Sequence, residues 1–238
     1  MSNSLETSFP VLDTGYVQLL ETFGDELTVV NAARVSFGVK HSTLTEGDIK
    51  LLSYLYRNKH MSPFRHVMLR FKIRAPEFVM RQMYKHVVGI EATSTYPTQL
   101  HSWNEISGRY KPYDEFYIPE VWRSQSSDSK QASDGPLSED LQAKCKELFE
   151  GSMEHMQTTY KMLLEAGVAR EQARILLPLN VYTETIWTCS LQALLNFIEL
   201  RDHHHAQIEI QEYAKVLRKI VKERFPIIYR IFCPEESM

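Results

Sequence analysis

The chain has 238 residues, 43% hydrophobic and 24% charged, a composition that excludes disordered and fibrous proteins. Its formal net charge of −3 argues against binding of nucleic acid or anionic membranes by the surface as a whole. Anions could still bind at local clusters of basic residues. Cys145, Cys189 and Cys233 are too few and too scattered for a disulfide framework or a zinc site, and no apolar run is long enough for a membrane span, so we expect a cytoplasmic protein with a single domain over 1–238.

Short strands and helices are predicted in the first part of the chain. Residues 8–23 mix β-branched and aromatic side chains around a turn, which favours one or two strands. Asp25 is a candidate cap for a helix that continues through 31–36, and Thr45 precedes a second helix at 49–58. Residues 66–74 alternate strictly, which is typical of a half-buried strand. The buried face of that strand is predicted to carry Val67, Leu69, Phe71 and Ile73.

Helices dominate the predictions for the rest of the chain. Pro76 favours the start of a helix over 77–88, and an irregular loop rich in Thr and Ser follows. Residues 123–140 are almost free of apolar side chains and predict a mobile surface loop. Further helices are expected at 139–166 (capped by Ser138), 170–177, 183–200 and 206–224. The sum is an α+β fold, with a small antiparallel sheet and a C-terminal helical bundle.

Gln82, Lys85 and His86 are a first candidate for a binding site. They lie three and four residues apart, so all three share one face of the predicted helix. An amide, a cation and an imidazole on one face suit a planar polar ligand or an anion. A solvated helix surface is the better interpretation when spacing alone is considered.

The segment 104–110 carries a second candidate. Ser107, Gly108 and Arg109 supply a hydroxyl, a backbone free to approach closely, and a guanidinium that can bind a phosphate with two hydrogen bonds. Asn104 and Glu105 could orient a sugar or a heterocycle. By composition alone, a turn with a surface ion pair explains this segment equally well.

The last third of the chain adds isolated polar groups in apolar surroundings. Arg174 precedes ILLPLN and is expected to be partly buried, and therefore to need a carboxylate or a ligand as partner. Arg201 ends an apolar helix, within which Asn196 also requires a partner. The consecutive histidines 203–205 cannot all reach one ion from a single helix, so no metal is expected.

The sequence gives little support for catalysis by a nucleophilic side chain of the protein. The sequence has no G-x-S-x-G motif, no cysteine with a histidine close in sequence, and no Gly-rich phosphate loop. The arginines, amides and histidines that remain bind and polarise ligands. An enzyme built from them would take its reactivity from a cofactor.

Several segments together resemble the flavin-dependent thymidylate synthases, the ThyX family. They cover most of the chain in order, and each is weak alone whereas the ordered set is highly specific. The matching segments are AARVSF (32–37), SPFRH (62–66), APEFVMRQMYKH (75–86), WNEISGRY (103–110), EFYIP (115–119), AREQARILLPLNVYT (169–183) and LLNFIELRDHHHAQIEIQEYA (194–214).

The resemblance implies a ThyX-like fold and a homotetramer with active sites at the subunit interfaces. It implies FAD as cofactor, with NADPH and methylenetetrahydrofolate as co-substrates. The implied reaction is the reductive methylation of dUMP at C5 to dTMP, carried out without an enzymic cysteine nucleophile.

The resemblance also implies roles for individual residues. Nucleotide binding falls to Gln82, Lys85, Glu105, Ser107, Gly108, Arg109, Arg174 and Arg201. Arg201 is the catalytic candidate, because a guanidinium that stabilises the N3-ionised uracil raises the electron density at C5. Flavin contacts fall to Ser62, Lys85, His86, Asn104, Glu105, Ser190, Asn196, Leu200 and His205. His60 and Tyr110 are implied neighbours of the folate or the flavin.

Two features depart from the family pattern. The family motif R-H-R is Lys85-His86-Val87 here, and the spacer 87–102 before Trp103 is much longer than in the family. Lysine loses the two-pronged contact of arginine, and valine loses the charge altogether. Arg65, Arg81 or the loop residues 93–96 are the candidates to replace these groups.

The altered loop leaves alternatives to the dUMP reaction. One is a specialised UMP/dUMP C5-methylase of nucleoside-antibiotic biosynthesis, in which the loop accommodates the ribose 2′-hydroxyl. The other is a flavin- or nucleotide-binding scaffold without catalysis, which the missing arginines favour and the retained Arg109, Arg174 and Arg201 oppose.

Overall fold

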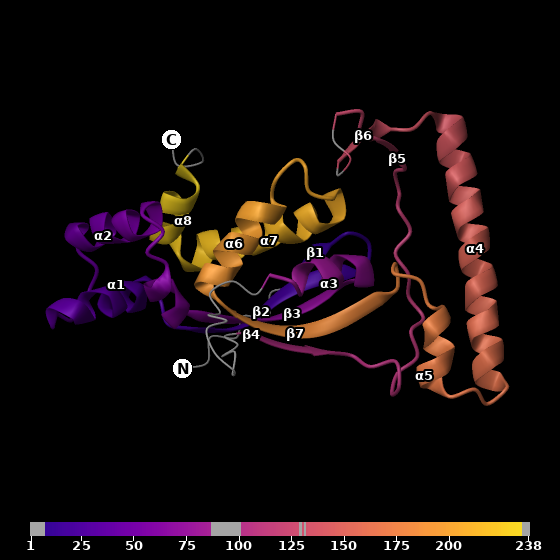
Figure 1. Ribbon diagram of the computed structural model, residues 1–238, viewed down its shortest axis with the longest axis horizontal. Coiled ribbons are helices and arrows are strands. Elements are labelled where there is room, and N and C mark those ends of the chain that lie inside the picture. The colour runs from indigo at the N-terminus through magenta and orange to yellow at the C-terminus, as the bar shows by residue number, and fades with distance from the viewer. Residues whose placement is uncertain (1–7, 87–100, 129, 131, 235–238) are drawn as a thin grey trace.

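An antiparallel sheet of five strands forms the centre of the protein (Figure 1). The computed structural model describes residues 8–86, 101–128, 130 and 132–234. The strands are β1 (Ser8–Val11), β2 (Gly15–Phe23), β3 (Met68–Pro76), β4 (His101–Glu105) and β7 (Tyr182–Ser190). Their spatial order is β1-β2-β3-β7-β4, so the last strand in the sequence lies between two earlier ones.

Strand β3 confirms the alternation seen in the sequence. Val67, Leu69, Phe71 and Ile73 are all fully buried, at 0% exposure. Their neighbours point to the other face, where Arg70 pairs with Glu21 and Lys72 pairs with Glu184. A side-chain period of two therefore separates the core from a charged surface.

Strand β7 corrects the prediction of a helix over 183–200. Thr185 pairs with Ile73 of β3, and Trp187 pairs with Trp103 of β4. The helix α6 (Leu191–Arg201) begins only after Ser190, whose hydroxyl accepts a hydrogen bond from the Ala193 amide at 3.2 Å. The threonines and the tryptophan of this segment favour a strand, and pairing on both sides stabilises it against helix formation.

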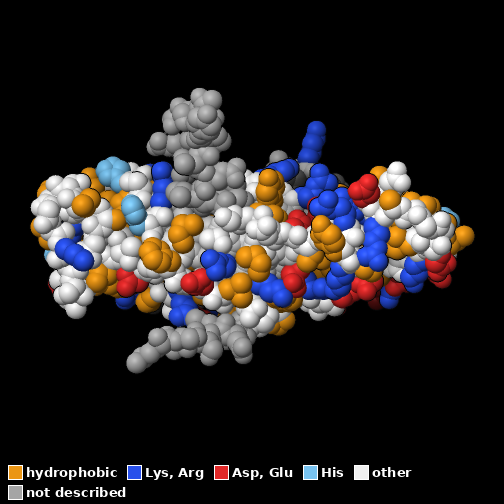
Figure 2. Space-filling view, turned by 90° about the horizontal axis from the view of Figure 1, so that it is seen from below, with side chains coloured by type: hydrophobic (Ala, Val, Ile, Leu, Met, Phe, Trp, Pro, Cys, Tyr) orange, Lys and Arg blue, Asp and Glu red, His pale blue; other side chains and the backbone are white. Residues whose placement is uncertain are grey.

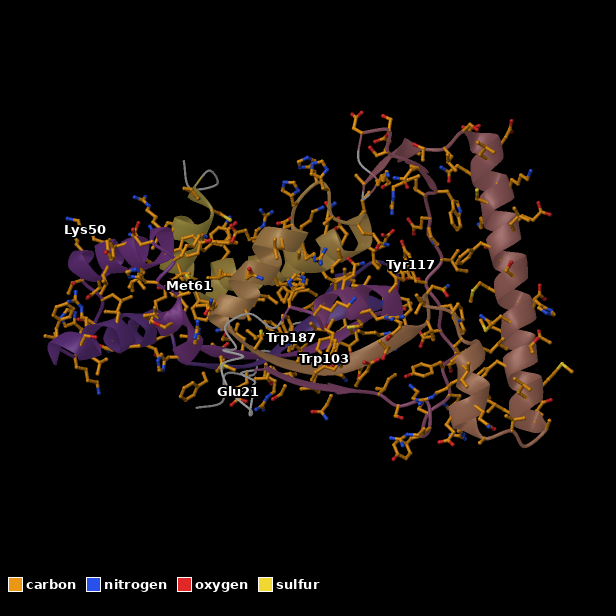
Figure 3. All side chains as sticks on the ribbon, viewed as in Figure 1. Glu21, Lys50, Met61, Trp103, Tyr117 and Trp187 are labelled. Carbon is orange, nitrogen blue, oxygen red and sulfur yellow. The ribbon has the colours of Figure 1, made fainter. Side chains whose placement is uncertain are left out.

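Helices α3 (Glu77–Met83), α6 and α7 (Ile208–Arg224) cover one face of the sheet (Figure 1). Trp187 is fully buried between them and the strands, with its ring centroid 6.0 Å from that of Phe197 and 6.4 Å from that of Trp103 (Figure 3). The core thus continues from the sheet into the helices, as expected for an α+β fold.

One end of the molecule is built from α1 (Glu26–Arg34), α2 (Glu46–Arg57), α8 (Pro226–Phe232) and the short turns η1 (Val35–Phe37) and η2 (Ser62–His66). Asp25 and Thr45 form capping boxes with Thr28 and Asp48, so both predicted helix starts are confirmed.

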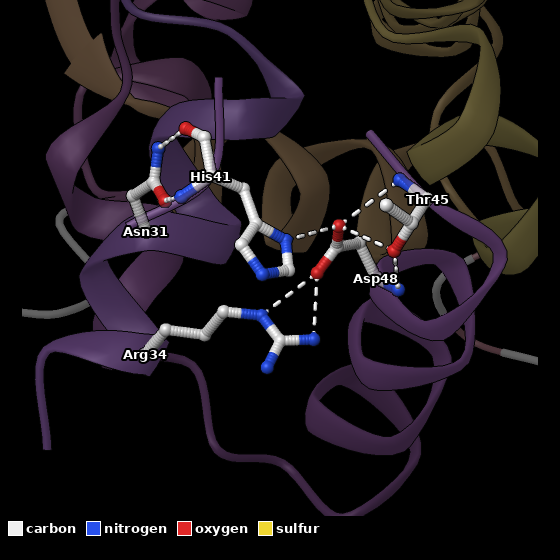
Figure 4. Close-up of polar contacts among 5 residues, drawn as sticks. All are labelled: Asn31, Arg34, His41, Thr45 and Asp48. Carbon is white, nitrogen blue, oxygen red and sulfur yellow. Dashed lines mark hydrogen bonds and ion pairs between the residues drawn. The ribbon is translucent and has the colours of Figure 1, made fainter. Parts of the chain in front are cut away.

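A buried carboxylate holds α1 and α2 together (Figure 4). Asp48, at 0% exposure, accepts hydrogen bonds from Arg34 Nε and Thr45 Oγ1 at 2.7 and 2.8 Å, and its Oδ2 lies 2.7 Å from His41 Nδ1. Burial alone would raise the pKa of this carboxyl, but the hydrogen bonds from His41, Thr45 and Arg34 outweigh it and lower the pKa well below its usual range.

The opposite end carries α4 (Glu139–Glu165), α5 (Arg170–Ala173) and the turn η3 (Arg174–Leu176). A two-stranded hairpin, β5 (Arg123–Gln125) and β6 (Ser133–Pro136), lies in the range where a polar surface loop is predicted. Trp122 packs edge-on against Phe149 of α4, with 5.2 Å between ring centroids.

The predicted helix over 77–88 and the loop after it have other ends in the structure than the sequence indicates. Helix α3 stops at Met83 rather than at residue 88, and residues 87–100 lie outside the described part of the chain. The end of the predicted loop, from residue 101, belongs to β4. Among the described helices, none combines the length and the apolar character that crossing a membrane requires.

Candidate functional site

A cavity of about 500 Å³ opens where β4 runs into the turn at Gly108 and meets η3. It brings together Glu105, Ser107, Arg109 and Arg174, which the sequence places in two separate segments. A hydroxyl and two guanidinium groups in one cavity provide the donors that an anion such as a phosphate requires.

Gly108 allows this turn to pack closely. A Cβ atom at this position would lie 2.5 Å from Tyr113 Cε2 and 3.3 Å from Arg174 Cδ. Tyr113 is itself held by its hydroxyl, which donates to the Ile106 carbonyl at 3.2 Å. Glycine is therefore required here for steric reasons, as the close backbone approach inferred from the sequence anticipates.

The prediction that Arg174 is partly buried is wrong. Its side chain is exposed, because the apolar residues around it are exposed as well: Ile175 is 80% exposed and Leu179 50%. Nothing in the described structure pairs Arg174 with a carboxylate at ion-pair distance. No carboxylate therefore offsets the positive charge of the guanidinium, which is available to a ligand.

The surroundings of the cavity are basic. Arg109, Lys111, Arg170 and Arg174 are all exposed, and Arg170 Nη1 donates to the Tyr110 carbonyl at 2.8 Å, which joins the turn to α5. On the face seen in Figure 2, Lys and Arg side chains gather toward the end of the molecule that carries α4 and α5. This local positive charge exists within a chain whose net charge is −3.

A second polar group lies away from that cavity, at the end of α6. Arg201 Nε donates to His86 Nε2 at 2.9 Å, and His86 packs edge-on against Phe197 with 5.1 Å between ring centroids. Burial, assisted by the positive charge of Arg201, lowers the pKa of His86 to about 4. The imidazole is neutral at neutral pH, so it orients Arg201 without cancelling its charge.

The predicted helix face of Gln82, Lys85 and His86 is wrong in part. Because α3 ends at Met83, Lys85 and His86 lie beyond it, with Lys85 exposed and His86 only 7% exposed. Gln82 instead reaches Gln207, the residue before α7, and its Nε2 donates to Gln207 Oε1 at 2.8 Å. The three side chains therefore do not act as one surface.

A separate cavity of about 350 Å³ lies between α2, η2 and α6. Its polar lining consists of Tyr56, Lys59, Gln192, Asn196 and the carboxylate of Glu199, so Asn196 lies at a cavity and not wholly among apolar side chains. Arg65 Nε donates to Gln192 Oε1 at 2.6 Å, which brings a further cation to this region. Amides, a phenol ring and cations fit a cofactor that has both a heterocycle and phosphates.

The other residues predicted to contact the flavin do not line this cavity, and they differ in their exposure. Ser62 is exposed at the start of η2, and Asn104 and His205 are exposed too. Leu200 is 54% exposed, whereas Ser190 is 1% exposed and uses its hydroxyl to cap α6. Of the two further neighbours, His60 packs edge-on against Tyr54, and Tyr110 is 79% exposed.

The histidines 203–205 lie in a turn beyond α6, not on a helix. Their ligand nitrogens all lie within 4.8 Å of one another, so the argument that excluded a shared ion from helical geometry does not hold. The absence of a metal stays a prediction.

Cysteine chemistry is disfavoured by position. Cys189 is fully buried in β7, and burial raises the pKa of its thiol. A thiol kept protonated is a poor nucleophile. Among the described residues, no cysteine lines the two cavities described above.

Comparison with known proteins gives one consistent family. The model of the Thy1 family, described as thymidylate synthase complementing protein, matches residues 18–227. The chain is 42% identical over 223 residues to the flavin-dependent thymidylate synthase of Kosmotoga olearia, covering 93% of this chain and 91% of that protein. It is also 42% identical over 226 residues to a flavin-dependent thymidylate synthase of Thermus thermophilus, covering 94% of this chain and 78% of that protein.

Solved structures are similar as well. The UMP/dUMP methylase PolB from Streptomyces cacaoi bound with 5-Br UMP matches with a TM-score of 0.77 and 29% identity, covering 94% of this chain and 96% of that chain. The same enzyme bound with 5-Br dUMP matches with a TM-score of 0.79 and 29% identity, covering 93% and 95%.

Proposed function

The chain belongs to the Thy1 family of flavin-dependent thymidylate synthases, and from this premise we propose that its cavity at Ser107, Arg109 and Arg174 binds dUMP for reductive methylation at C5 to dTMP. The observation that carries the proposal is the convergence of these three donors, from two distant segments, in one cavity of about 500 Å³. That volume is within the usual range for a small-ligand site.

Within this site the arginines have distinct roles. Ser107 and Arg109 are adjacent through a 3.4 Å contact between Ser107 Oγ and Arg109 Nε, and together they hold the phosphate. Arg174 holds the uracil together with an Arg201 that a second copy of the chain brings to this cavity, since Arg201 of the same chain does not line it. Arg201 retains its charge beside the neutral His86, so it stabilises negative charge on the ring and raises the electron density at C5.

FAD is the cofactor of this family, and the residues of the chain fit it. The cavity at Gln192 and Asn196 offers amides for the heterocycle, and Lys59 in its lining and Arg65 bound to Gln192 are the cations that we assign to the flavin phosphates. When bound, FAD would supply the redox chemistry, with NADPH as reductant and methylenetetrahydrofolate as the source of the carbon unit. The protein contributes binding, orientation and the charge of Arg201.

Exposed apolar side chains support the assembly of four chains that we propose for this function. Phe37 is 81% exposed, Ile175 80% and Val35 73%, which is unusual for side chains of this size in a lone chain. Burial of these groups between subunits would remove them from water. Light scattering of the purified protein is expected to give the mass of four chains, and a monomer at micromolar concentration would contradict the assembly.

The central test is turnover. Purified protein supplied with FAD, dUMP, methylenetetrahydrofolate and NADPH is expected to form dTMP, and to bleach its flavin absorbance on addition of NADPH. An Arg109→Ala variant should lose most of the activity at low dUMP. Arg70→Ala, on the face of β3 that points away from the core, should not. A protein that binds flavin and dUMP but forms no dTMP would favour a scaffold.

UMP is a second candidate substrate. The observation that favours it is the similarity to a methylase whose structures hold 5-Br UMP and 5-Br dUMP. The same assay with UMP in place of dUMP decides between the two. Turnover of dUMP without detectable product from UMP would exclude this candidate.

A further inference from the structure

A third cavity, of about 350 Å³, lies beside the start of α7 and is also lined by α3, α4 and the segment 117–123. We call it the α7 cavity. Glu77, Leu179 and Val181 line the cavity proposed for the nucleotide. Their neighbours in the chain, Phe78 and Asn180, line the α7 cavity instead. The two cavities therefore have no lining residue in common and share only a stretch of backbone.

Glu209 is the most deeply buried polar residue of the α7 cavity. It is 3% exposed, and its Oε1 accepts hydrogen bonds from Arg123 Nη2 at 2.7 Å and from the Tyr117 hydroxyl at 3.3 Å. Its Oε2 is buried as well, but no donor among the described residues is in hydrogen-bonding distance of it. Because the guanidinium of Arg123 pairs with the carboxyl group, Oε2 is left as an acceptor.

Two further polar atoms of the cavity lack a partner within the described part of the chain. Asn180 is 8% exposed, and its Nδ2 donates to the Tyr117 carbonyl at 2.7 Å, but its Oδ1 accepts no hydrogen bond. The Nε1 of Trp122 is a buried N–H donor without an acceptor. Buried polar atoms are nearly always hydrogen-bonded, so three such atoms around one cavity indicate a bound molecule that completes them.

Aromatic rings form the walls around these polar atoms. The ring centroids of Phe78 and Tyr117 lie 5.9 Å apart, and those of Trp122 and Phe149 lie 5.2 Å apart. Figure 3 shows Tyr117 between the sheet and α4. The cavity volume is roughly ten times the share of one water molecule in the liquid, which is about 30 Å³, and aromatic walls offer water few hydrogen bonds. A small organic molecule therefore fits this space better than isolated waters.

The polar atoms restrict the chemistry of that molecule. The free acceptors of Glu209 and Asn180 require N–H or O–H donors, and the N–H of Trp122 requires an acceptor. A cation is disfavoured because Arg123 already pairs with Glu209, and a phosphate is disfavoured because it brings acceptors where donors are needed. A flat, uncharged ring with N–H groups and a carbonyl oxygen satisfies these conditions, and its faces can pack on the aromatic walls.

We propose that the α7 cavity is a binding site for an uncharged aminopyrimidinone ring, with Glu209, Asn180 and Trp122 as its hydrogen-bonding residues. The site lies outside the cavities assigned to the nucleotide and to the flavin, so the inference does not depend on the proposed function. Local sequence patterns do not point to these residues, because they come from three segments far apart in the chain.

Calorimetric titration of the flavin-loaded protein tests the site. The probes are cytosine and isocytosine, two isomers whose amino groups lie at different ring positions, and at least one is expected to bind wild type with a dissociation constant below about 1 mM. Glu209→Gln should weaken this binding about tenfold or more. Arg123 and Tyr117 hold the amide oxygen of the glutamine, so an N–H₂ group replaces the free acceptor. No binding of either isomer would overturn the proposal.

Further variants locate the binding. Trp122→Phe keeps a ring against Phe149 and removes the N–H, so it should weaken binding about threefold or more, and it decides the question if Glu209→Gln does not fold. Glu223→Gln, at an exposed position of α7, and Arg109→Ala, in the nucleotide cavity, should bind the probe as wild type does. Unchanged binding in both Glu209→Gln and Trp122→Phe, or loss of binding in Arg109→Ala, would place the probe elsewhere and overturn the proposal.

A crystal structure of the flavin-loaded protein with the bound isomer identifies the occupant of the cavity. The ring is expected against Tyr117 and Trp122, with its N–H groups donating to Glu209 and Asn180. A cavity that holds water alone, or a side chain from a second copy of the chain, would overturn the proposal. Neither experiment measures the turnover of dUMP, so a failure of this inference and a failure of the proposed function are distinguishable.

Discussion

At the residue scale, Gly108 and His86 show how a side chain, or its absence, sets the properties of an arginine. Without a Cβ, Gly108 leaves room for Tyr113 and Arg174 at the cavity that we propose for the nucleotide. His86, buried and neutral, orients Arg201 by a 2.9 Å hydrogen bond. In both cases the guanidinium is positioned without a carboxylate, so its charge remains available to a ligand.

Gly108→Ala is expected to weaken nucleotide binding. The added Cβ would press on the ring of Tyr113 and on Arg174, so the KM for dUMP should rise about tenfold, which corresponds to about 1.4 kcal/mol. Steady-state kinetics measure the effect. Gly151→Ala on α4, where a Cβ meets nothing within 4 Å, is the matched control. Equal KM values for the two variants would show that the close packing at Gly108 is unimportant.

His86→Gln is expected to make the protein less sensitive to acid. Because the pKa of His86 in the folded state is about 4, below its ordinary value of 6.5, the folded state resists protonation of this group. Its stabilising contribution is complete above pH 6.5 and is lost as the pH falls through 4, with a limit of about 3 kcal/mol. Glutamine can accept the bond from Arg201 without titrating.

Thermal unfolding of wild type and His86→Gln between pH 7 and 4 measures this difference. The melting temperature of wild type should fall more steeply below pH 6.5. Parallel curves would contradict a neutral buried imidazole.

At the element scale, the buried carboxylate of Asp48 fastens two helices and the connection between them. Arg34 comes from α1, Thr45 caps α2, and His41 lies in the segment that joins the two helices. Both helix starts follow from local capping patterns. That Asp48 serves at once as a capping-box residue and as the partner of Arg34 follows only from the packing of α1 against α2.

Asp48→Asn is therefore expected to destabilise the fold by about 3 kcal/mol, because it leaves Arg34 without its anionic partner in a buried site. Denaturant unfolding measures the loss. Glu21→Gln removes an ion pair with Arg70 in which both side chains are at least half exposed, and should cost under about 1 kcal/mol. Similar losses for the two variants would contradict the structural role of Asp48.

At the scale of the whole molecule, the residues assigned to the uracil do not meet within one chain. Arg174 lines the nucleotide cavity, whereas Arg201 pairs with His86 and is absent from the lining of that cavity. We therefore propose that a site that uses both arginines is completed by a second copy of the chain. This separation agrees with the proposed assembly, in which active sites lie between subunits.

Mixed assemblies test this arrangement. Arg174→Ala and Arg201→Ala should each be nearly inactive alone, but subunits of both kinds expressed together should regain part of the wild-type activity, because some interfaces then contain both native arginines. Assemblies of the Arg174→Ala, Arg201→Ala double variant are the control. Mixed assemblies as inactive as that control would place both arginines of a site on one chain.

The sequence by itself determined the features that depend on neighbouring residues. The capping boxes at Asp25 and Thr45, the alternation of β3 and the donors of 107–109 involve residues only a few positions apart. The family resemblance also came from ordered local segments, and the comparisons confirm it.

Tertiary structure alone decided whatever depends on distant partners. β7 is a strand because β3 and β4 pair with it on both sides. Burial and the charge of Arg201 lower the pKa of His86, and burial and the charge of Glu105 raise the pKa of Glu77. The physical reason is common to all three: burial and charge interactions act across space, between residues that the chain order leaves far apart. The net charge of −3 likewise did not reveal the basic surface around the cavity of Arg109 and Arg174, which forms only when the chain folds.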